Sequence, residues 1–400
     1  MIAVGTAVFR RIIVFGWMGH ERGGFSLKTR LSSSLEIPLA KPVFDEEMKK
    51  AAVEALLNER FVLGESVYKF EEEFARYCNV DFAVSTSSGT NALQIAFVAL
   101  GIKPGDRVIT TSASFVATSN AVLHARGEPD FADIALTTYT IDPGRIRRAV
   151  GPKTRGVVPV HLYGYPADMD AVNEVAEKEG LFVVEDACQA HGAIYKGRKV
   201  GGLSSAACFS FYSSKNMTVA GDGGMLVTDD KKVAEDSKKL RDCGRVSQYV
   251  HDVVGYTSRL NTVNAAIGRV QLKRLDEWNE KRVRNAGEYD RLLSDVEGLS
   301  LPPSGDGRTK PVYHLYVVRT SRRDDLEKWL RSNGIHCGIH YSLPIHLQPV
   351  YKGMYGFTEG MLPKSEELCR TCLSLPMYPS LGSEEIEFVS ERIHEFFGSR

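Results

Sequence analysis

The sequence has little cysteine and no excess of either charge. Its seven cysteines are scattered along 400 residues, and an odd, scattered set does not build a disulfide framework. The 50 basic and 50 acidic residues cancel to a formal charge of zero, so no net field draws the chain onto nucleic acid or an anionic membrane. The neutral net charge favours a function that acts on a small molecule, and the scattered cysteines favour a reducing compartment. We expect a cytoplasmic protein with neither nucleic acid nor membrane as a partner.

Long apolar runs and internal repeats are also missing. The apolar N-terminal stretch MIAVGTAVFRRIIVFGWMGH is broken by Arg10 and Arg11 and is too short on either side to span a bilayer. A twin-arginine export signal is the weaker interpretation of this stretch. We expect residues 1–34 to form a poorly ordered extension and the folded body to begin near Leu35.

What is present is the composition of an ordinary globular protein, with 43% hydrophobic and 25% charged residues, and enough length for one large and one smaller domain. From about residue 80, short β-rich runs alternate with helical patterns, which predicts a parallel sheet with crossover helices. After Tyr256 the pattern changes to one long helical run, then a strand, a helix and a strand. We predict an α/β fold, with a large, mostly parallel-sheet domain at 35–265 and a small α+β C-terminal domain at 266–400. The expected strands are 82–87, 106–112, 154–162, 182–187, 208–212, 223–228, 311–320 and 334–342, and the expected helices are 89–100, 114–125, 167–180, 261–296 and 323–334.

Unusual residues follow several of the predicted strands, where ligands bind in open α/β sheets. The run Ser88-Gly89-Thr90 opens a helix, whose free backbone NH groups suit a phosphate, although a plain N-cap is the commoner use of such residues. Phe115 follows the next strand, where its ring either covers a flat ligand or packs in the core. Asp186 ends a buried strand, where it caps a turn or holds a charged ring nitrogen.

Lys215 follows another strand in FSFYSSKN. A lysine in such a place is usually solvated, but a partly buried one loses its proton more readily and can form a Schiff base. A phosphate cradle, a covering aromatic ring, a carboxylate for a pyridine nitrogen and a Schiff-base lysine are together what pyridoxal 5′-phosphate (PLP) needs. The ordered set therefore indicates a PLP site.

The order of SSGTNAL, SFVAT, PVHLYGYPADMDA, VVEDACQAHGA, FSFYSSKN and GDGGMLVT resembles the DegT/DnrJ/EryC1/StrS family of PLP-dependent sugar aminotransferases. The resemblance runs from about Leu35 to the C-terminus and implies the type I, aspartate aminotransferase-like fold. It implies that Lys215 forms the Schiff base and moves protons, and that Asp186 holds the pyridine nitrogen. The other cofactor contacts that it implies are Gln189 beside the ring hydroxyl, Phe115 on the ring, and Gly89, Thr90 and Ser210 at the phosphate.

The resemblance also implies a reaction, in which glutamate or glutamine donates an amino group to the keto group of a nucleotide-linked sugar. The segment GIHCGIHYSLPIHLQPVY is similar to one frequent in enzymes that aminate C3, although Ser342 stands where proline is common. It makes His340, Tyr341 and His346 candidate substrate contacts, while packing in the core is an equal alternative for the histidines.

A homodimer with shared active sites is implied as well. The segment GYTSRLNTVNAA, residues 255–266, resembles the loop that one subunit lends to the cofactor phosphate of its partner. Thr257 stands where the family commonly has asparagine, so we expect Arg259 or Asn261 to share that contact.

Several alternatives stay open. The protein could aminate C4, as a perosamine synthase does, or bind PLP as a regulator without transaminase activity. Three other classes are disfavoured. A dehydratase relative would typically have histidine in place of Lys215. A cysteine desulfurase would need a reactive cysteine in a glycine-rich loop, and no cysteine lies in such a context. A nucleotide-binding module would need a GxGxxG or GxxxxGKS pattern, which the SSGTNAL turn lacks. Cys369 and Cys372 form a single CxxC without a second pair, so we interpret them as structural and predict no metal site.

Overall fold

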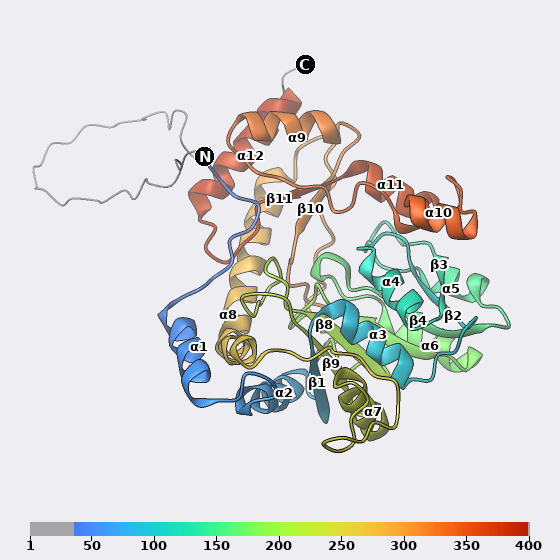
Figure 1. Ribbon diagram of the computed structural model, residues 1–400. Helices are drawn as coiled ribbons and strands as arrows, with labels where there is room; N and C mark the ends of the chain where they lie inside the picture. The colour runs from blue at the N-terminus through green and yellow to red at the C-terminus, as the bar shows by residue number, and fades with distance from the viewer. Residues whose placement is uncertain (1–35, 399–400) are drawn as a thin grey trace, which may run out of the picture. The chain divides into compact units, whose positions relative to one another are not determined.

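A computed structural model describes residues 36–398 (Figure 1), so the predicted extension at 1–34 lies outside the described residues. The described residues belong to one compact unit. Its centre is a seven-stranded sheet in the order β1-β9-β8-β5-β4-β2-β3. Strands β3, β2, β4, β5 and β8 pair in parallel, whereas β9 runs antiparallel to both β8 and β1. The predicted α/β fold with a mostly parallel sheet is confirmed. The strands are β1 (Phe82–Thr86), β2 (Arg107–Thr111), β3 (Glu128–Ala132), β4 (Thr154–Val158), β5 (Phe182–Asp186), β8 (Ala206–Ser210) and β9 (Gly224–Thr228).

Helices cover both faces of this sheet (Figure 1). In β5, Val183 packs into one hydrophobic cluster and the next residue, Val184, into another, because successive side chains of a strand point to opposite faces. The cluster of Val183 contains residues of α2 (Glu65–Cys78), α5 (Pro143–Ala149), α6 (Met169–Glu179) and α8 (Thr262–Leu293). The cluster of Val184 contains residues of α3 (Gly89–Ala99), α4 (Ala117–His124) and α7 (Lys231–Arg241). Burial on both faces explains why these strands are continuous apolar runs in the sequence.

Local signals set where the helices begin and end. The Asp168 carboxylate accepts a hydrogen bond from the Ala171 backbone N–H at 3.3 Å and caps α6, which satisfies one of the free N–H groups of the first turn. Gly180 ends the same helix with a φ of 65°, a left-handed conformation that glycine adopts at no steric cost. The helix bounds therefore follow from residues that the sequence shows.

The C-terminal part follows α8, an uninterrupted helix that covers most of the long helical run expected at 261–296. Strand β10 pairs antiparallel with β11. The strand predicted at 334–342 is wrong: that segment makes only isolated bridges, from Ile335 to Ile37 and from Gly338 to Ser374. The two partners come from opposite ends of the chain and each meets the segment at one residue, so no ladder forms. The remaining elements are α1 (Glu46–Asn58), η1 (Leu162–Gly164), β6 (Ile194–Tyr195), β7 (Arg198–Lys199), β10 (Tyr316–Arg319), α9 (Arg323–Ser332), η2 (Ile345–Leu347), α10 (Pro349–Tyr355), α11 (Pro363–Thr371), β11 (Cys372–Leu375) and α12 (Ser383–Gly398).

The division into domains near residue 265 stays a prediction. Helix α8 contacts α1 and α2 on one side of that boundary and α12 on the other, so it links both predicted domains. Cys369 lies in the last turn of α11 and Cys372 begins β11, and both are buried free thiols, which supports a packing role. Within residues 36–398, no helix is long and apolar enough to cross a membrane, and no group of three or more His, Cys, Asp or Glu side chains is arranged to hold a metal ion.

Candidate active site

A cavity of about 520 Å³ lies where the parallel strands end. The loops after β1, β2, β5 and β8 form much of its wall, and segments near residues 39 and 314–341 complete it. This is the edge of the sheet at which the sequence predicted a ligand. The predicted site residues that line the cavity are Gly89, Thr90, Phe115, Asp186, Gln189, Ser210, Lys215, His340 and Tyr341.

The start of α3 forms the first part of the cavity wall. Ser88 is the N-cap, and its hydroxyl accepts a hydrogen bond from the Asn91 backbone N–H at 3.1 Å, so the plain capping role is present. The helix start also leaves free N–H groups and a positive dipole end at Gly89 and Thr90. A Cβ on Gly89 would lie 2.8 Å from both Cys188 Sγ and Ser210 Cβ. Only glycine fits there, and the result is an open cradle for an anion.

Asp186, at the end of β5, is 5% exposed. One carboxylate oxygen, Oδ2, accepts a hydrogen bond from the Thr118 hydroxyl at 2.7 Å, and the other, Oδ1, accepts one from the Cys188 backbone N–H at 3.2 Å. These two donors hold the carboxylate plane in one orientation within the cavity wall. A carboxylate held this way can bind a protonated ring nitrogen.

Lys215 lies in a turn after β8, where its backbone N–H donates to the Tyr212 carbonyl at 2.8 Å. Burial lowers the pKa of its amine below the ordinary value of 10.5, and the electrostatic effects of Cys188 and Asp186 partly oppose this. Desolvation therefore makes the neutral, nucleophilic amine more available than it is on an exposed lysine.

Aromatic and amide side chains complete the wall. Phe115 is 53% exposed, and its ring centroid lies 5.6 Å from that of Tyr341. The Gln189 carbonyl oxygen accepts from the Tyr163 backbone N–H at 2.8 Å, which leaves its amide group directed to the Tyr341 hydroxyl at 3.5 Å. An exposed ring beside a fixed amide suits a flat, polar ligand.

These groups fit PLP on their own chemistry. Gly89, Thr90 and Ser210 would hold its phosphate, because the glycine cradle and the helix start offer free N–H groups to an anion. Asp186 would bind the pyridine nitrogen, Phe115 would cover the ring, and the Lys215 amine would bond to the cofactor.

Two predicted site residues lie outside the cavity wall. His346 is fully buried, its Nδ1 is 2.7 Å from the Ser112 hydroxyl, and its Nε2 is 3.2 Å from Glu366 Oε1. This arrangement supports the core alternative for His346, and its substrate contact stays a prediction that no geometry favours. Arg259 donates to Asp242 Oδ1 at 2.5 Å, so its contact with a partner's phosphate is also still a prediction.

Several residues that line the cavity could not be predicted from motifs in the sequence. Thr118 lies one turn after Ser114, and that spacing of hydroxyl residues was the only available signal for it. Nothing in the local sequence marked His314, which reaches the cavity from a segment far along the chain. The missed residues include Leu39, Ser114, Thr118, Cys188, Tyr212, Asp222 and His314.

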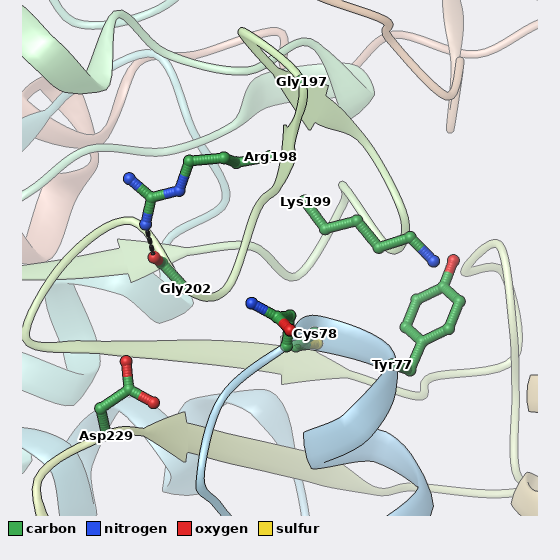
Figure 2. Close-up of a pocket in the computed structure, with 8 residues that line it drawn as sticks. Tyr77, Cys78, Gly197, Arg198, Lys199, Gly202 and Asp229 are labelled. Carbon is green, nitrogen blue, oxygen red and sulfur yellow. Dashed lines mark hydrogen bonds between the residues drawn. The ribbon is translucent and has the colours of Figure 1, made fainter.

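A second cavity, of about 430 Å³, lies at the opposite edge of the sheet (Figure 2). Asn79 precedes β1 and Gly202 precedes β8, so this is the amino end of those strands. Its cations already have partners: Arg198 donates to the Gly202 carbonyl, and Lys199 Nζ lies 3.4 Å from the centroid of the Tyr77 ring. We assign no ligand to this cavity.

Comparison with known proteins agrees with the site. The model of the DegT/DnrJ/EryC1/StrS aminotransferase family matches residues 42–394. The chain is 42% identical over 362 residues to the dTDP-3-amino-3,4,6-trideoxy-alpha-D-glucose transaminase of Streptomyces venezuelae, with 90% of this chain and 95% of that protein covered. It is also 42% identical over 353 residues to a "pleiotropic regulatory protein" of Geobacillus stearothermophilus, with 88% and 94% covered.

The solved structure of S. venezuelae DesV in complex with a ketimine intermediate matches with a TM-score of 0.87 and 41% identity, over 91% of this chain and 99% of that one. Fold and site together define a PLP-dependent aminotransferase of the type I fold. The chain belongs to the DegT/DnrJ/EryC1/StrS aminotransferase family.

Proposed function

We propose that the protein transfers an amino group from glutamate or glutamine to the C3 keto group of a nucleotide-linked deoxysugar, for the synthesis of amino sugars in polysaccharides or other glycans. The observation that carries this proposal is the presence of Lys215 and Asp186 in one cavity that has the fold and residues of a PLP site. C3 is supported by the name of the S. venezuelae relative, whose product is a 3-amino sugar, and by the likeness of residues 334–351 to enzymes that act at C3.

PLP, when bound, supplies a ring that accepts the electrons released at the amino-bearing carbon. The residues of this chain do the rest. Asp186 holds positive charge at the ring nitrogen, and its two hydrogen bonds keep it oriented for that task. Lys215, whose pKa burial lowers, removes and returns the proton at the reacting carbon. The rings of Phe115 and Tyr341, with centroids 5.6 Å apart in the cavity wall, flank the space for the cofactor ring.

We also propose a homodimer in which residues 255–266 of one chain complete the cavity of the other. Among the described residues that line the cavity, Lys215 is the one lysine or arginine, beside the carboxylates Asp186 and Asp222. A phosphate, a nucleotide and an amino acid carboxylate need more positive charge than that, and Arg259 of a second copy would supply it. The preceding loop exposes apolar side chains to about half or more, including Tyr249 at 84% and Val254 at 92%, as a surface that meets a partner does.

The alternatives predict different outcomes. A C4 aminotransferase shares every cofactor residue described above, so only the substrate separates it from a C3 enzyme. A regulatory PLP-binding protein is suggested by the name of the G. stearothermophilus relative. The presence of Lys215 favours catalysis over that role, because binding alone does not need a proton carrier.

A substrate panel tests the proposal. The purified, PLP-saturated protein is incubated with glutamate or glutamine and with dTDP-, UDP- and GDP-linked 3-keto and 4-keto sugars, and the products are measured by mass and by NMR. The proposal predicts a 3-amino sugar nucleotide from at least one pair. A 4-amino product would support the first alternative, and no product from any pair would support the second.

A further inference from the structure

One imidazole in the cavity wall is left without a partner. His314 lines the cavity and is 6% exposed, and its Nδ1 has no hydrogen-bond partner among residues 36–398. A buried polar atom without a partner costs free energy, so such atoms in native proteins call for an explanation. His314 itself lines the cavity, so a ligand bound there is the candidate partner for this imidazole.

The backbone holds His314 in place from both sides. Tyr313 has a φ of 42°, a left-handed conformation that costs free energy for a residue with a side chain and that is concentrated at functional sites. The buried Arg282 donates to the Tyr313 carbonyl at 3.3 Å. A Cβ on Gly164 would lie 2.9 Å from the His314 backbone nitrogen, so this peptide packs directly against Gly164. The structure thus fixes a strained segment that presents His314.

The ring is electrically neutral. Burial, and after it the charges of Lys215 and Arg282, lower the pKa of His314 well below its ordinary value of 6.5. A neutral imidazole carries one donor and one acceptor nitrogen. It therefore suits hydroxyl and keto groups, whereas a phosphate or carboxylate would favour a cation.

His314 differs from the neighbouring His340 in one respect. Nδ1 of His340 lies 2.8 Å from the Ser374 hydroxyl, so the fold already uses that atom. Both histidines come from the C-terminal part of the chain, whereas the cavity-lining residues assigned to the cofactor lie between positions 89 and 215. His314 therefore belongs to the part of the wall that is left for the substrate.

We propose that His314 is a substrate-binding residue whose imidazole forms a hydrogen bond to an uncharged oxygen of the sugar next to the reacting carbon. This inference rests on the proposed function, because it takes a nucleotide-linked sugar as the ligand. It adds a specificity contact that neither the motifs nor the relatives' names assign. Replacement of His314 should weaken binding of the sugar and leave binding of the cofactor unchanged.

The test compares His314→Phe, which keeps an aromatic ring without hydrogen-bonding groups, with His314→Gln, which keeps a donor and an acceptor. Exposed His124, changed to Gln, is the matched control. For each full-length protein, PLP affinity is measured by fluorescence quenching, and the affinity of the PLP-saturated protein for the amino-sugar product is measured by calorimetry. Circular dichroism checks that each variant is folded.

We expect His314→Phe to bind PLP within about twofold of wild type and the sugar nucleotide about 10- to 100-fold more weakly, as loss of one buried hydrogen bond predicts. His314→Gln should recover part of this loss, and His124→Gln should match wild type. Wild-type sugar affinity in His314→Phe would overturn the inference, as would a loss of PLP affinity as large as the loss of sugar affinity. A wild-type protein that neither binds nor aminates any sugar of the panel would instead remove the proposed function, and the inference with it.

Discussion

Asp186 is a single side chain on which two donors converge, the Thr118 hydroxyl and the Cys188 backbone N–H. Asparagine at this position keeps the size and an acceptor oxygen but carries no charge. We expect Asp186→Asn to remain folded and to lose far more than tenfold in turnover, because a neutral amide cannot hold a pyridinium charge.

The measurement is steady-state turnover at saturating PLP, with Asp168→Asn as control, since Asp168 caps α6, accepts a hydrogen bond from the Tyr195 hydroxyl and does not line the cavity. If Asp186→Asn kept turnover within about tenfold of wild type, a barrier change of only about 1.4 kcal/mol, Asp186 would be no more than a turn cap.

His191 shows how burial of one group links stability to pH. Its ring lies 5.3 Å from that of Phe209 and 5.8 Å from that of Phe211, and neither ring nitrogen has a hydrogen-bond partner in residues 36–398. Burial, with a smaller effect of the Lys215 charge, lowers the pKa of His191 from 6.5 to about 3, although the nearby Ser210 backbone weakly opposes this. As the pH falls below 6.5, the unfolded chain takes up this proton and the folded chain does not, so the free energy of unfolding decreases until the pH reaches about 3.

Replacement of His191 by leucine removes the group whose protonation differs between the folded and the unfolded chain. We expect the slope of the unfolding free energy against pH, measured by urea unfolding between about pH 6 and pH 4, to be smaller in His191→Leu by up to about 1.4 kcal/mol per pH unit. Equal slopes in the two proteins would contradict the buried, neutral state of His191, whatever the change in overall stability.

The first turn of α3 shows what an element contributes to the site. Because a Cβ on Gly89 would lie 2.8 Å from atoms of both Cys188 and Ser210, Gly89→Ala should force the helix start away from the end of β8. We expect PLP to bind at least about tenfold more weakly, as expected when a charged hydrogen bond at the phosphate is lost.

Gly287 in α8 is the matched control, because a Cβ there meets no atom within 4 Å. Gly287→Ala should leave PLP affinity unchanged and stabilise the helix by up to about 1 kcal/mol. Unchanged PLP affinity in Gly89→Ala, measured by fluorescence titration, would contradict the proposed binding of the cofactor phosphate at Gly89.

At the scale of elements, the sequence predicts the bounds of helices and strands best where the pattern of apolar residues runs without interruption. The strands β4 and β5 and the helices α3 and α8 lie within a few residues of their predicted bounds, because burial on both faces of the sheet imposes their pattern. The segment 334–342 has a β-like composition but pairs at single residues with two distant partners. Local sequence carries no trace of such partners.

Single site residues were also predictable only where local sequence patterns determine their position. Motifs near the strand ends predicted seven residues that line the cavity, because the carboxyl ends of the parallel strands meet at one edge of the sheet. The likeness of segment 334–351 predicted two more, His340 and Tyr341. His314 reaches the cavity through tertiary packing against Gly164 and Arg282, which local patterns do not encode. His346 stands in a motif beside two cavity residues, yet Ser112 and Glu366 draw its ring into the core.

At the scale of the whole molecule, the prediction concerns the proposed homodimer. A C2 dimer places two equivalent sites across one interface, so each chain would both give and receive the loop that contains Arg259. The single variants Lys215→Ala and Arg259→Ala should each be inactive or severely impaired. After complete subunit exchange in an equal mixture, we expect about a quarter of the wild-type sites to be restored, because half of the dimers are hybrids with one intact site each.

Native mass spectrometry follows the exchange, and turnover of the mixture gives the readout. Complete exchange without any recovery would contradict the shared site, and an active monomer in sedimentation would contradict the dimer itself.

The central claim is that Lys215 carries the cofactor, and one measurement tests it most directly. The purified protein is saturated with PLP, reduced with borohydride, digested and mapped by mass spectrometry, with Lys215→Arg treated in parallel. Because burial lowers the pKa of the Lys215 amine within the cavity, we predict a pyridoxyl adduct on the peptide that contains Lys215 and none in the variant. An adduct on any other lysine, or an equal adduct in Lys215→Arg, would contradict the account.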